Sequence, residues 1–140
     1  MFSPEEIRAF LERSSPSMLG VVGTIRADGS PHVVPVWYRY DGEAVLIWTA
    51  EDRVWVRNLT RDSRAAFSVQ EEQLPFSAVV MRGRAKVHTS DGADVDAEIR
   101  RITERYVAPE EVESYISQFP DLRTIVTIRP EKITAWGRGY

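Results

Sequence analysis

Short apolar runs, each about the length of a β-strand, follow one another through the first third of the chain. Met18 to Arg26 is apolar and β-branched, and Ala27-Asp28-Gly29-Ser30 after it is typical of a hairpin turn. Pro31 to Tyr40 is therefore predicted to return antiparallel beside the first run. A second turn at Asp41-Gly42-Glu43 and an apolar run from Ala44 to Thr49 complete a predicted three-stranded meander.

Further strand-length runs follow in the rest of the chain. Gly83 is expected to mark a bend or bulge in one of them, and Arg129-Pro130-Glu131 is expected to form a turn. The strands predicted in this part are residues 65–69, 76–88, 122–128 and 132–136.

Three segments have helical rather than strand patterns. Ser3-Pro4-Glu5-Glu6 combines a serine cap, a proline at the first helical position and a glutamate three residues after the cap. Ile7, Phe10 and Leu11 then give this helix one apolar face, so we expect it to cover or plug a sheet. A helical section is predicted after Asp91-Gly92, with Val95, Ile99, Ile102 and Tyr106 at helical spacing, and a short helix begins near Pro109.

The order of these elements indicates the fold class. Six or seven short strands with inserted helices, and no alternation of strand and helix, favour an antiparallel barrel with helices packed outside it. A length of 140 residues fits one domain, residues 1–140, with a core of its own. The expected class is therefore mainly β with helices, a β-barrel of α+β type.

A fourth helical segment, Thr49 to Leu59, contains a row of arginines. This segment reads as the end of a strand followed by a short helix, with Asp52 as its expected N-cap. Trp55 and Leu59 form an apolar stripe on this helix. The cationic stripe beside it consists of Arg53, Arg57 and Arg61, at positions i, i+4 and i+8.

This arginine stripe has two interpretations. A helix N-terminus favours anions because its first N–H groups are unpaired, and guanidinium groups add charge and bidentate hydrogen bonds, which suggests a phosphate site. Alternatively, the arginines are a solvated helix face balanced by Glu51 and Asp62. The local pattern leaves both open.

The strand Pro31 to Tyr40 is unusual because it contains Pro35. Proline cannot donate to a sheet ladder, so this strand is expected to lie at an edge or contain a bulge next to Val36 to Tyr38. Irregular backbone leaves N–H and C=O groups free for the rim of a flat heteroaromatic ring such as an isoalloxazine. The simpler interpretation is an edge strand packed by aromatic residues.

Composition and motifs exclude several classes of protein. The net charge is −3, from 18 basic and 21 acidic residues, which argues against general binding of nucleic acid or anionic membranes. The chain has no cysteine, no nucleotide-binding glycine motif and no serine-hydrolase motif. Its two histidines, His32 and His88, are far apart in the sequence, so no metal site is expected. The acidic N-terminus lacks the pattern of a secretion signal, and we expect a cytoplasmic protein.

Several of these segments together resemble a known family. They are Asp28-Gly29-Ser30-Pro31-His32, Pro35-Val36-Trp37, Arg57-Asn58-Leu59 with Arg61-Asp62 and Arg64, Arg82-Gly83-Arg84-Ala85, and Ile128-Arg129-Pro130-Glu131-Lys132-Ile133 before Trp136. In this order and spacing they resemble the pyridoxamine 5′-phosphate oxidase-like family of flavin and deazaflavin split barrels. Within it, the resemblance is greatest to the small proteins thought to use coenzyme F420.

The resemblance implies a six-stranded antiparallel split barrel, of the FMN-binding type, that forms a homodimer with two cofactor sites between the subunits. FMN or F420 would be the cofactor. By position, the ring would be lined by Val36, Trp37 and Tyr38, the phosphate would be held by Thr49, Arg53, Arg57 and Asn58, and the partner subunit would contribute Phe76 and Ser77.

The chain departs from the family pattern at two positions in the predicted phosphate site. Many members have lysine where this chain has Trp55, and serine where it has Arg53. Loss of the lysine removes a point charge that Arg53 could replace with a planar guanidinium. Trp55 is then either a cofactor contact or a packing residue.

The expected function is that of an oxidoreductase that transfers a hydride between FMN or F420 and a small conjugated substrate. Because such a cofactor carries the chemistry, no catalytic side chain needs to stand out, although Tyr38 or Arg39 could assist protonation or orient the substrate. The alternative is a protein of the same fold that carries flavin or haem without turnover, with His32 and His88 as candidate haem ligands.

Overall fold

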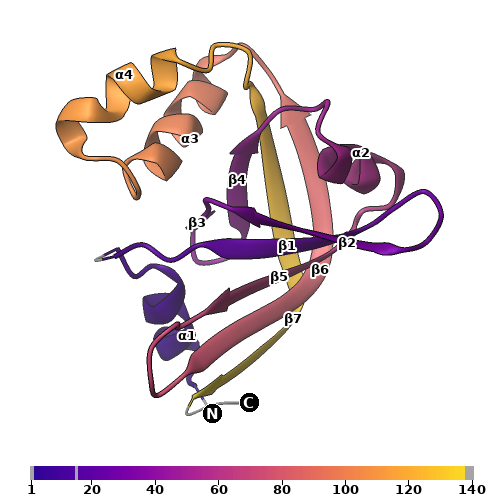
Figure 1. Ribbon diagram of the computed structural model, residues 1–140, viewed down its shortest axis with the longest axis vertical. Helices are drawn as coiled ribbons and strands as arrows, with labels where there is room; N and C mark the ends of the chain where they lie inside the picture. Colours follow the sequence, from indigo (N-terminus) through magenta and orange to yellow (C-terminus); the bar gives the residue numbers. More distant parts are fainter. Residues whose placement is uncertain (1, 15, 138–140) are drawn as a thin grey trace.

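The computed structural model describes residues 2–14 and 16–137. Its strands and helices are arranged as a curled antiparallel sheet with helices at its ends and side (Figure 1). The elements are α1 (Pro4–Leu11), β1 (Gly20–Ile25), β2 (Pro31–Val36), β3 (Arg39–Tyr40), β4 (Val45–Thr49), α2 (Val54–Arg61), β5 (Arg64–Gln70), β6 (Ser77–Thr89), α3 (Ala93–Thr103), the 3₁₀ turn η1 (Pro109–Glu111), α4 (Val112–Ser117) and β7 (Thr124–Gly137).

The two edges of this sheet belong to one stretch of chain. The strand order is β2-β1-β5-β6-β7-β4-β3, and only Trp37 and Tyr38 separate β2 from β3. The sheet therefore curls until its edges meet at these two residues. This confirms the predicted six-stranded split barrel, with one of the six strands interrupted. It also confirms that Pro35 lies on an edge strand, where its missing N–H costs no ladder hydrogen bond.

The predicted meander is only partly right. β1 and β2 pair as expected, from Gly20 opposite Val36 to Ile25 opposite Pro31. β4, however, pairs with the two-residue strand β3 and, on its other side, with β7. Because of the interruption at Trp37 and Tyr38, the end of the predicted strand forms β3 at the opposite edge of the sheet.

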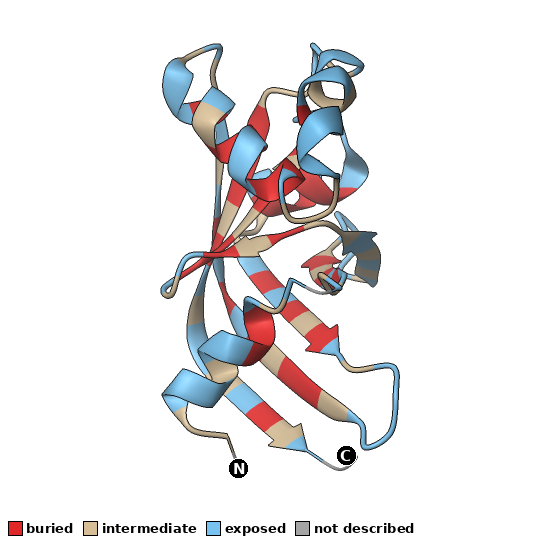
Figure 2. Cartoon of the chain, turned by 90° about the vertical axis from the view of Figure 1, so that its left-hand side faces the viewer, coloured by how far each residue is buried: buried red, intermediate tan, exposed pale blue. Residues whose placement is uncertain are grey.

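The inside of the barrel is a continuous apolar core, seen as the buried stripes of Figure 2. Tyr38, Phe67 and Met81 are among its largest fully buried side chains. Phe10 and Leu11 of α1 extend into it, as expected for a plug. The capping box of this helix is also confirmed, because Glu6 N–H donates to Ser3 Oγ (3.1 Å) and Ser3 N–H donates to Glu6 Oε1 (3.0 Å).

The predicted N-cap of α2 is wrong by one residue. Arg53, with extended backbone, is the N-cap, and it makes no side-chain capping hydrogen bond, whereas Asp52 lies in the preceding turn. Trp55, Val56 and Leu59 all face the barrel from this helix and are buried. We attribute the later start to this packing, which outweighs a cap of about 1 kcal/mol.

The predicted turn at Arg129-Pro130-Glu131 is also wrong. β7 runs without a break along β6, and the register places Gly83 opposite Pro130 but Arg82 opposite Lys132, so that Glu131 is the extra residue of a β-bulge. A bulge tolerates proline because its extra residue leaves the ladder locally unpaired. The bend expected at Gly83 is confirmed, and it results from this bulge.

Helices α3 and α4 form a second, smaller apolar cluster at one end of the barrel, in which Val95, Ile99 and Ile102 of α3 pack against Ile125 of β7. The helical spacing predicted after Asp91-Gly92 is thus confirmed. An ion pair between Arg39 of β3 and Glu98 of α3 also holds α3 to the barrel.

Candidate functional site

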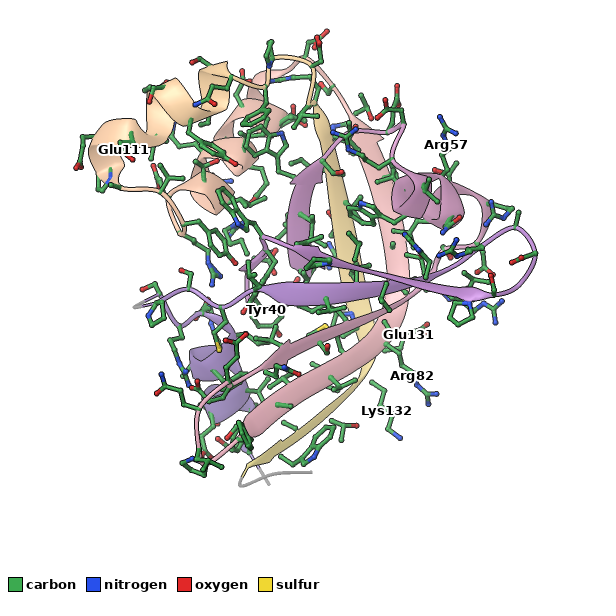
Figure 3. All side chains as sticks on the ribbon, in the orientation of Figure 1. Tyr40, Arg57, Arg82, Glu111, Glu131 and Lys132 are labelled. Atoms are coloured by element: carbon green, nitrogen blue, oxygen red, sulfur yellow. The ribbon has the colours of Figure 1, made fainter. Side chains whose placement is uncertain are left out.

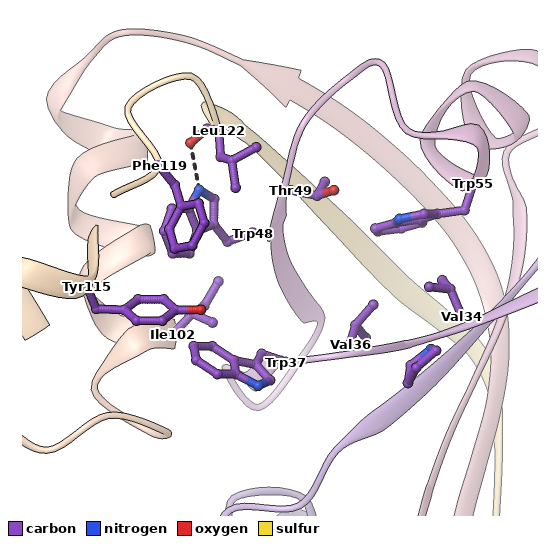
Figure 4. A pocket seen from close by; sticks show the side chains of 11 residues that line it. Val34, Val36, Trp37, Trp48, Thr49, Trp55, Ile102, Tyr115, Phe119 and Leu122 are labelled. Carbon is purple, nitrogen blue, oxygen red and sulfur yellow. Dashed lines mark hydrogen bonds between the residues drawn. The ribbon is translucent and has the colours of Figure 1, made fainter. Parts of the chain in front are cut away.

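A cavity of about 260 Å³ opens between the interrupted strand and helices α2, α3 and α4 (Figure 4). Its position follows from the break between β2 and β3, where the chain leaves the sheet and the helical cluster faces it. The residues that line it are Val34, Pro35, Val36, Trp37, Trp48, Thr49, Trp55, Ile102, Tyr115, Phe119 and Leu122.

Stacked aromatic rings fix one wall of this cavity. The Trp37 ring stacks on Tyr106 at 4.7 Å with an interplanar angle of 9°, and on Tyr115 at 5.2 Å. Trp48 contacts Tyr115 and Phe119 edge to face, and its Nε1 donates a hydrogen bond to the Leu122 carbonyl (2.6 Å). Such contacts hold the rings in place, so the wall is formed before any ligand arrives.

No charged side chain is among the residues that line the cavity. The hydroxyls of Thr49 and Tyr115 and the indole N–H groups of Trp37 and Trp55 are polar groups of its lining that have no hydrogen bond within the described part of the chain. Few polar groups on an apolar, aromatic surface favour a flat, uncharged group with polar edges.

Charged groups lie next to the cavity, around the start of α2. One hollow there, of about 420 Å³, is lined by Arg53 together with the carboxylates of Glu51, Asp52 and Asp121, and it shares Leu122 with the cavity. A second, of about 560 Å³, is lined by Arg57 and Arg61 and shares Glu51 with the first. The apolar cavity and the arginine stripe are therefore neighbours.

The three arginines of the stripe have different surroundings. Arg53 is half-exposed and lies 3.7 Å from Asp52, and Arg57 projects into solvent (Figure 3). Arg61 is held by the protein, because its Nη2 donates to the Ile25 carbonyl (2.7 Å) and to Asn58 Oδ1 (3.0 Å). Arg53 and Arg57 are thus the members free to turn toward an anion.

The structure brings four of the predicted site residues into the cavity wall: Val36, Trp37, Thr49 and Trp55. It places Arg53 and Arg57 in the adjoining hollows. It does not bring the other four there, namely Tyr38, Asn58, Phe76 and Ser77.

Tyr38 and Asn58 face the barrel core. The Tyr38 side chain is fully buried, and its hydroxyl donates to the Leu11 carbonyl (2.6 Å). Asn58 is 3% exposed, and its Nδ2 donates to Thr24 Oγ1 (3.1 Å). Their side chains hold α1 and α2 to the barrel.

Phe76 and Ser77 lie at the beginning of β6, where Ser77 pairs with Gly137. The helical cluster packs near the other end of this 13-residue strand. Their expected contribution to the site of a partner subunit stays a prediction.

We expect Tyr38 to stay protonated until strongly alkaline pH, because burial raises its pKa from 10.0 to about 12. A raised pKa means that the folded state binds this proton more tightly, so its contribution to stability is complete below pH 10 and is lost as the pH rises toward 12. Ultraviolet titration of tyrosinate in the wild type and in Tyr38→Phe tests this. Equal titration of all five tyrosines near pH 10 would contradict it.

The analysis of sequence missed most of the aromatic and apolar lining. The lining residues that were not predicted as site residues are Trp48 on β4, Tyr115 and Phe119 on and after α4, Leu122, Ile102, Val34 and Pro35. The spacing of Tyr115 and Phe119 at i and i+4 is the local signal that could have paired them. It gave no sign that this part of the chain would fold back onto Trp37.

The two histidines lie outside this cavity. His32 Nδ1 is 2.7 Å from Arg26 Nη2, and His88 Nε2 is 3.0 Å from Asp94 Oδ2. Within residues 2–14 and 16–137 there is no group of three or more side chains suited to hold a metal ion.

None of the helices in the described ranges is long and apolar enough to cross a membrane. The expected cytoplasmic location stays a prediction.

Several solved structures have a similar architecture. A conserved hypothetical protein from Mycobacterium tuberculosis superimposes with a TM-score of 0.83 at 26% identity, covering 99% of this chain and 86% of that one. An F420 reductase gives 0.70 at 23% identity (91% and 94%), and the haem storage protein HutZ from Vibrio cholerae gives 0.73 at 19% (99% and 98%). The family model described as pyridoxamine 5′-phosphate oxidase matches residues 3–137. The chain belongs to the pyridoxamine 5′-phosphate oxidase family.

Proposed function

We propose that this protein is an oxidoreductase that binds FMN or coenzyme F420 and reduces or oxidises a small, uncharged, conjugated substrate. The observation that carries the proposal is the aromatic cavity next to the arginines of α2. The aromatic cavity suits a flat ring, and the arginines suit a phosphate. The family and the F420 reductase of the same fold support it.

The residues present fit such a cofactor. Trp37 and Trp55 would contact the ring, and Thr49 offers a hydroxyl between the cavity and the α2 corner, where Arg53 and Arg57 would neutralise the phosphate. The cavity is small for a whole nucleotide, because small-molecule sites usually have volumes of roughly 300–1,000 Å³. The adjoining hollows would therefore hold the rest of the cofactor. When bound, the cofactor would supply the hydride chemistry.

The side chains of the cavity would orient the substrate and exclude water. Tyr115 brings a phenol hydroxyl to the lining, so it is the candidate to donate a hydrogen bond to the substrate. Tyr38 and Arg39 are less suited to the roles suggested for them, since Tyr38 is buried in the core and Arg39 is paired with Glu98.

We also propose that the protein is a homodimer. Leu19 and Val21 are large apolar residues that are 54% and 38% exposed, beside β1 and on it. A second copy would bury them and bring its Phe76 and Ser77 toward the site, as the family resemblance implies. Light scattering at working concentration tests this, and a monomer would contradict it.

The site is tested by replacing its arginines. Arg53→Ala and Arg57→Ala should each weaken binding of the cofactor by about 1.5 to 3 kcal/mol, the cost of a hydrogen bond to a charged group. Titrations of the protein with FMN and with F420, followed by tryptophan fluorescence, measure this.

Arg8→Ala is the matched control for these variants, because Arg8 is an exposed arginine on α1 that is paired with Glu12. It should leave the affinity unchanged. If Arg53→Ala and Arg57→Ala bind both cofactors as the wild type does, the phosphate site lies elsewhere.

A second candidate is a haem carrier, because HutZ and other haem-binding proteins share the fold. His32 and His88, the two histidines of the chain, both lie outside the cavity. A Soret band on titration with haemin that disappears in His32→Ala or His88→Ala, with no affinity for FMN or F420, would favour this function over the first.

A further inference from the structure

Five cationic side chains meet on the outer face of the sheet, away from the aromatic cavity. Arg64 of β5 is directly opposite Arg84 of β6, which is in turn opposite Arg129 of β7. In the next row, Arg82 of β6 is opposite Lys132 of β7. All five are exposed on the same face. Like charges directly opposite one another destabilise a sheet, so this arrangement has a cost in the absence of an anion.

Three of the five have a carboxylate nearby within the chain. Arg64 pairs with Asp62 at 2.7 Å, Arg84 is 3.9 Å from Glu131, and Arg129 is 3.7 Å from Glu43.

Arg82 and Lys132 have no such partner. Within residues 2–14 and 16–137 neither side chain makes a hydrogen bond or ion pair, and both project from the sheet into solvent (Figure 3). The two groups that face each other across the ladder are therefore the two without a counter-charge.

These side chains border a hollow of about 810 Å³. Gly23 and Ala66, which are opposite each other on β1 and β5, form a floor with almost no side chain, and Ala66 is next to Arg82. A ligand can therefore approach the sheet closely. Four cations line the hollow (Arg64, Arg82, Arg84 and Lys132) against one carboxylate, that of Glu131.

We propose that this face is a second binding site, for a small polyanion that carries at least two phosphate or carboxylate groups and is held between Arg82 and Lys132. The hollow has the size of a small-molecule site, and it shares no lining residue with the aromatic cavity. The net charge of −3 argues against a long nucleic acid as the ligand. The proposal does not depend on which cofactor the cavity binds.

The test is calorimetric titration of the full chain, without cofactor and at low salt, with tripolyphosphate and separately with citrate. The double variant R82Q/K132Q should weaken the binding of at least one of them roughly tenfold or more, since it removes two charge-assisted contacts. The control R8Q/R100Q removes the same charge from α1 and α3 and should bind as the wild type does. A preference for tripolyphosphate or for citrate identifies the phosphate or the carboxylate as the group recognised.

Thermal unfolding provides a second readout. Without ligand, R82Q should raise the melting temperature by about 1 to 4 °C, because it relieves a repulsion between opposite residues of the ladder. With tripolyphosphate or citrate, whichever binds, the wild type should be stabilised more than the variant.

Two results would overturn the proposal. One is unchanged binding by R82Q/K132Q, or no binding of either anion by the wild type at millimolar concentration. The other is binding that R53Q/R57Q abolishes and R82Q/K132Q does not, which would assign the anion to the α2 corner. That second result would leave the proposed cofactor site intact, so the two proposals fail separately.

Discussion

Arg39→Met should lower the free energy of unfolding by about 3 kcal/mol, the lower end of the cost of breaking a buried ion pair, because Glu98 then keeps only the exposed Arg101, 3.5 Å away, as a partner. Arg39 donates two hydrogen bonds of 2.7 Å to Glu98 on α3, and Glu98 is only 7% exposed. Methionine retains the apolar part of the side chain and removes the charge. Urea denaturation followed by circular dichroism measures the loss.

Two further variants show that the effect belongs to this pair. Arg64→Met breaks the exposed pair with Asp62 and should leave the free energy of unfolding nearly unchanged. Arg39→Met combined with Glu98→Leu should recover most of the loss, because no buried charge then remains. If Arg39→Met and Arg64→Met are equally mild, the Arg39 pair does not anchor α3 to the barrel.

Gly83→Ala should destabilise the fold by about 3 kcal/mol, at the upper end of the usual cost of overpacking. A Cβ at Gly83 would lie 2.0 Å from the Arg129 carbonyl oxygen and 2.9 Å from Pro130 Cα, both of which are backbone atoms that cannot rotate away. The strands β6 and β7 would have to separate at the bulge. Thermal and urea unfolding measure the change.

Gly23→Ala is the matched control, because the same methyl group would meet its nearest neighbour, Ala66 Cβ, at 3.4 Å. We expect it to be neutral or to stabilise by up to about 1 kcal/mol, since alanine restricts the unfolded chain. If Gly83→Ala and Gly23→Ala changed the stability equally, the close backbone contact at the bulge would not be the reason for glycine at position 83.

The candidate site could be predicted only in its local parts. Pro35 indicated an irregular edge strand, and the spacing of Arg53 and Arg57 indicated a cationic helix face, because both signals depend on neighbours within a few residues. Tyr38 was placed in the site by the family resemblance, but it is on the same side of the chain as Val36 and Tyr40, and its ring lies in the core.

The β-bulge in β7 also could not be predicted from its own segment. Arg129-Pro130-Glu131 has the composition of a turn, and nothing within the segment distinguishes a turn from a bulge in a long strand. The distinction depends on Gly83, 47 positions earlier than Pro130, whose missing side chain lets the two strands approach.

By itself, the sequence determined most of the strands, the capped first helix and an antiparallel barrel with helices outside it, because periodicity and capping are properties of short segments. The family resemblance added the split-barrel type. The tertiary structure alone decided that the two edges of the sheet meet at Trp37, that Tyr115 and Phe119 close an aromatic cavity there, and that Arg82 faces Lys132 on the outer surface. The physical reason is that these contacts join residues far apart in the chain, and only strand register and helix docking fix which of them meet.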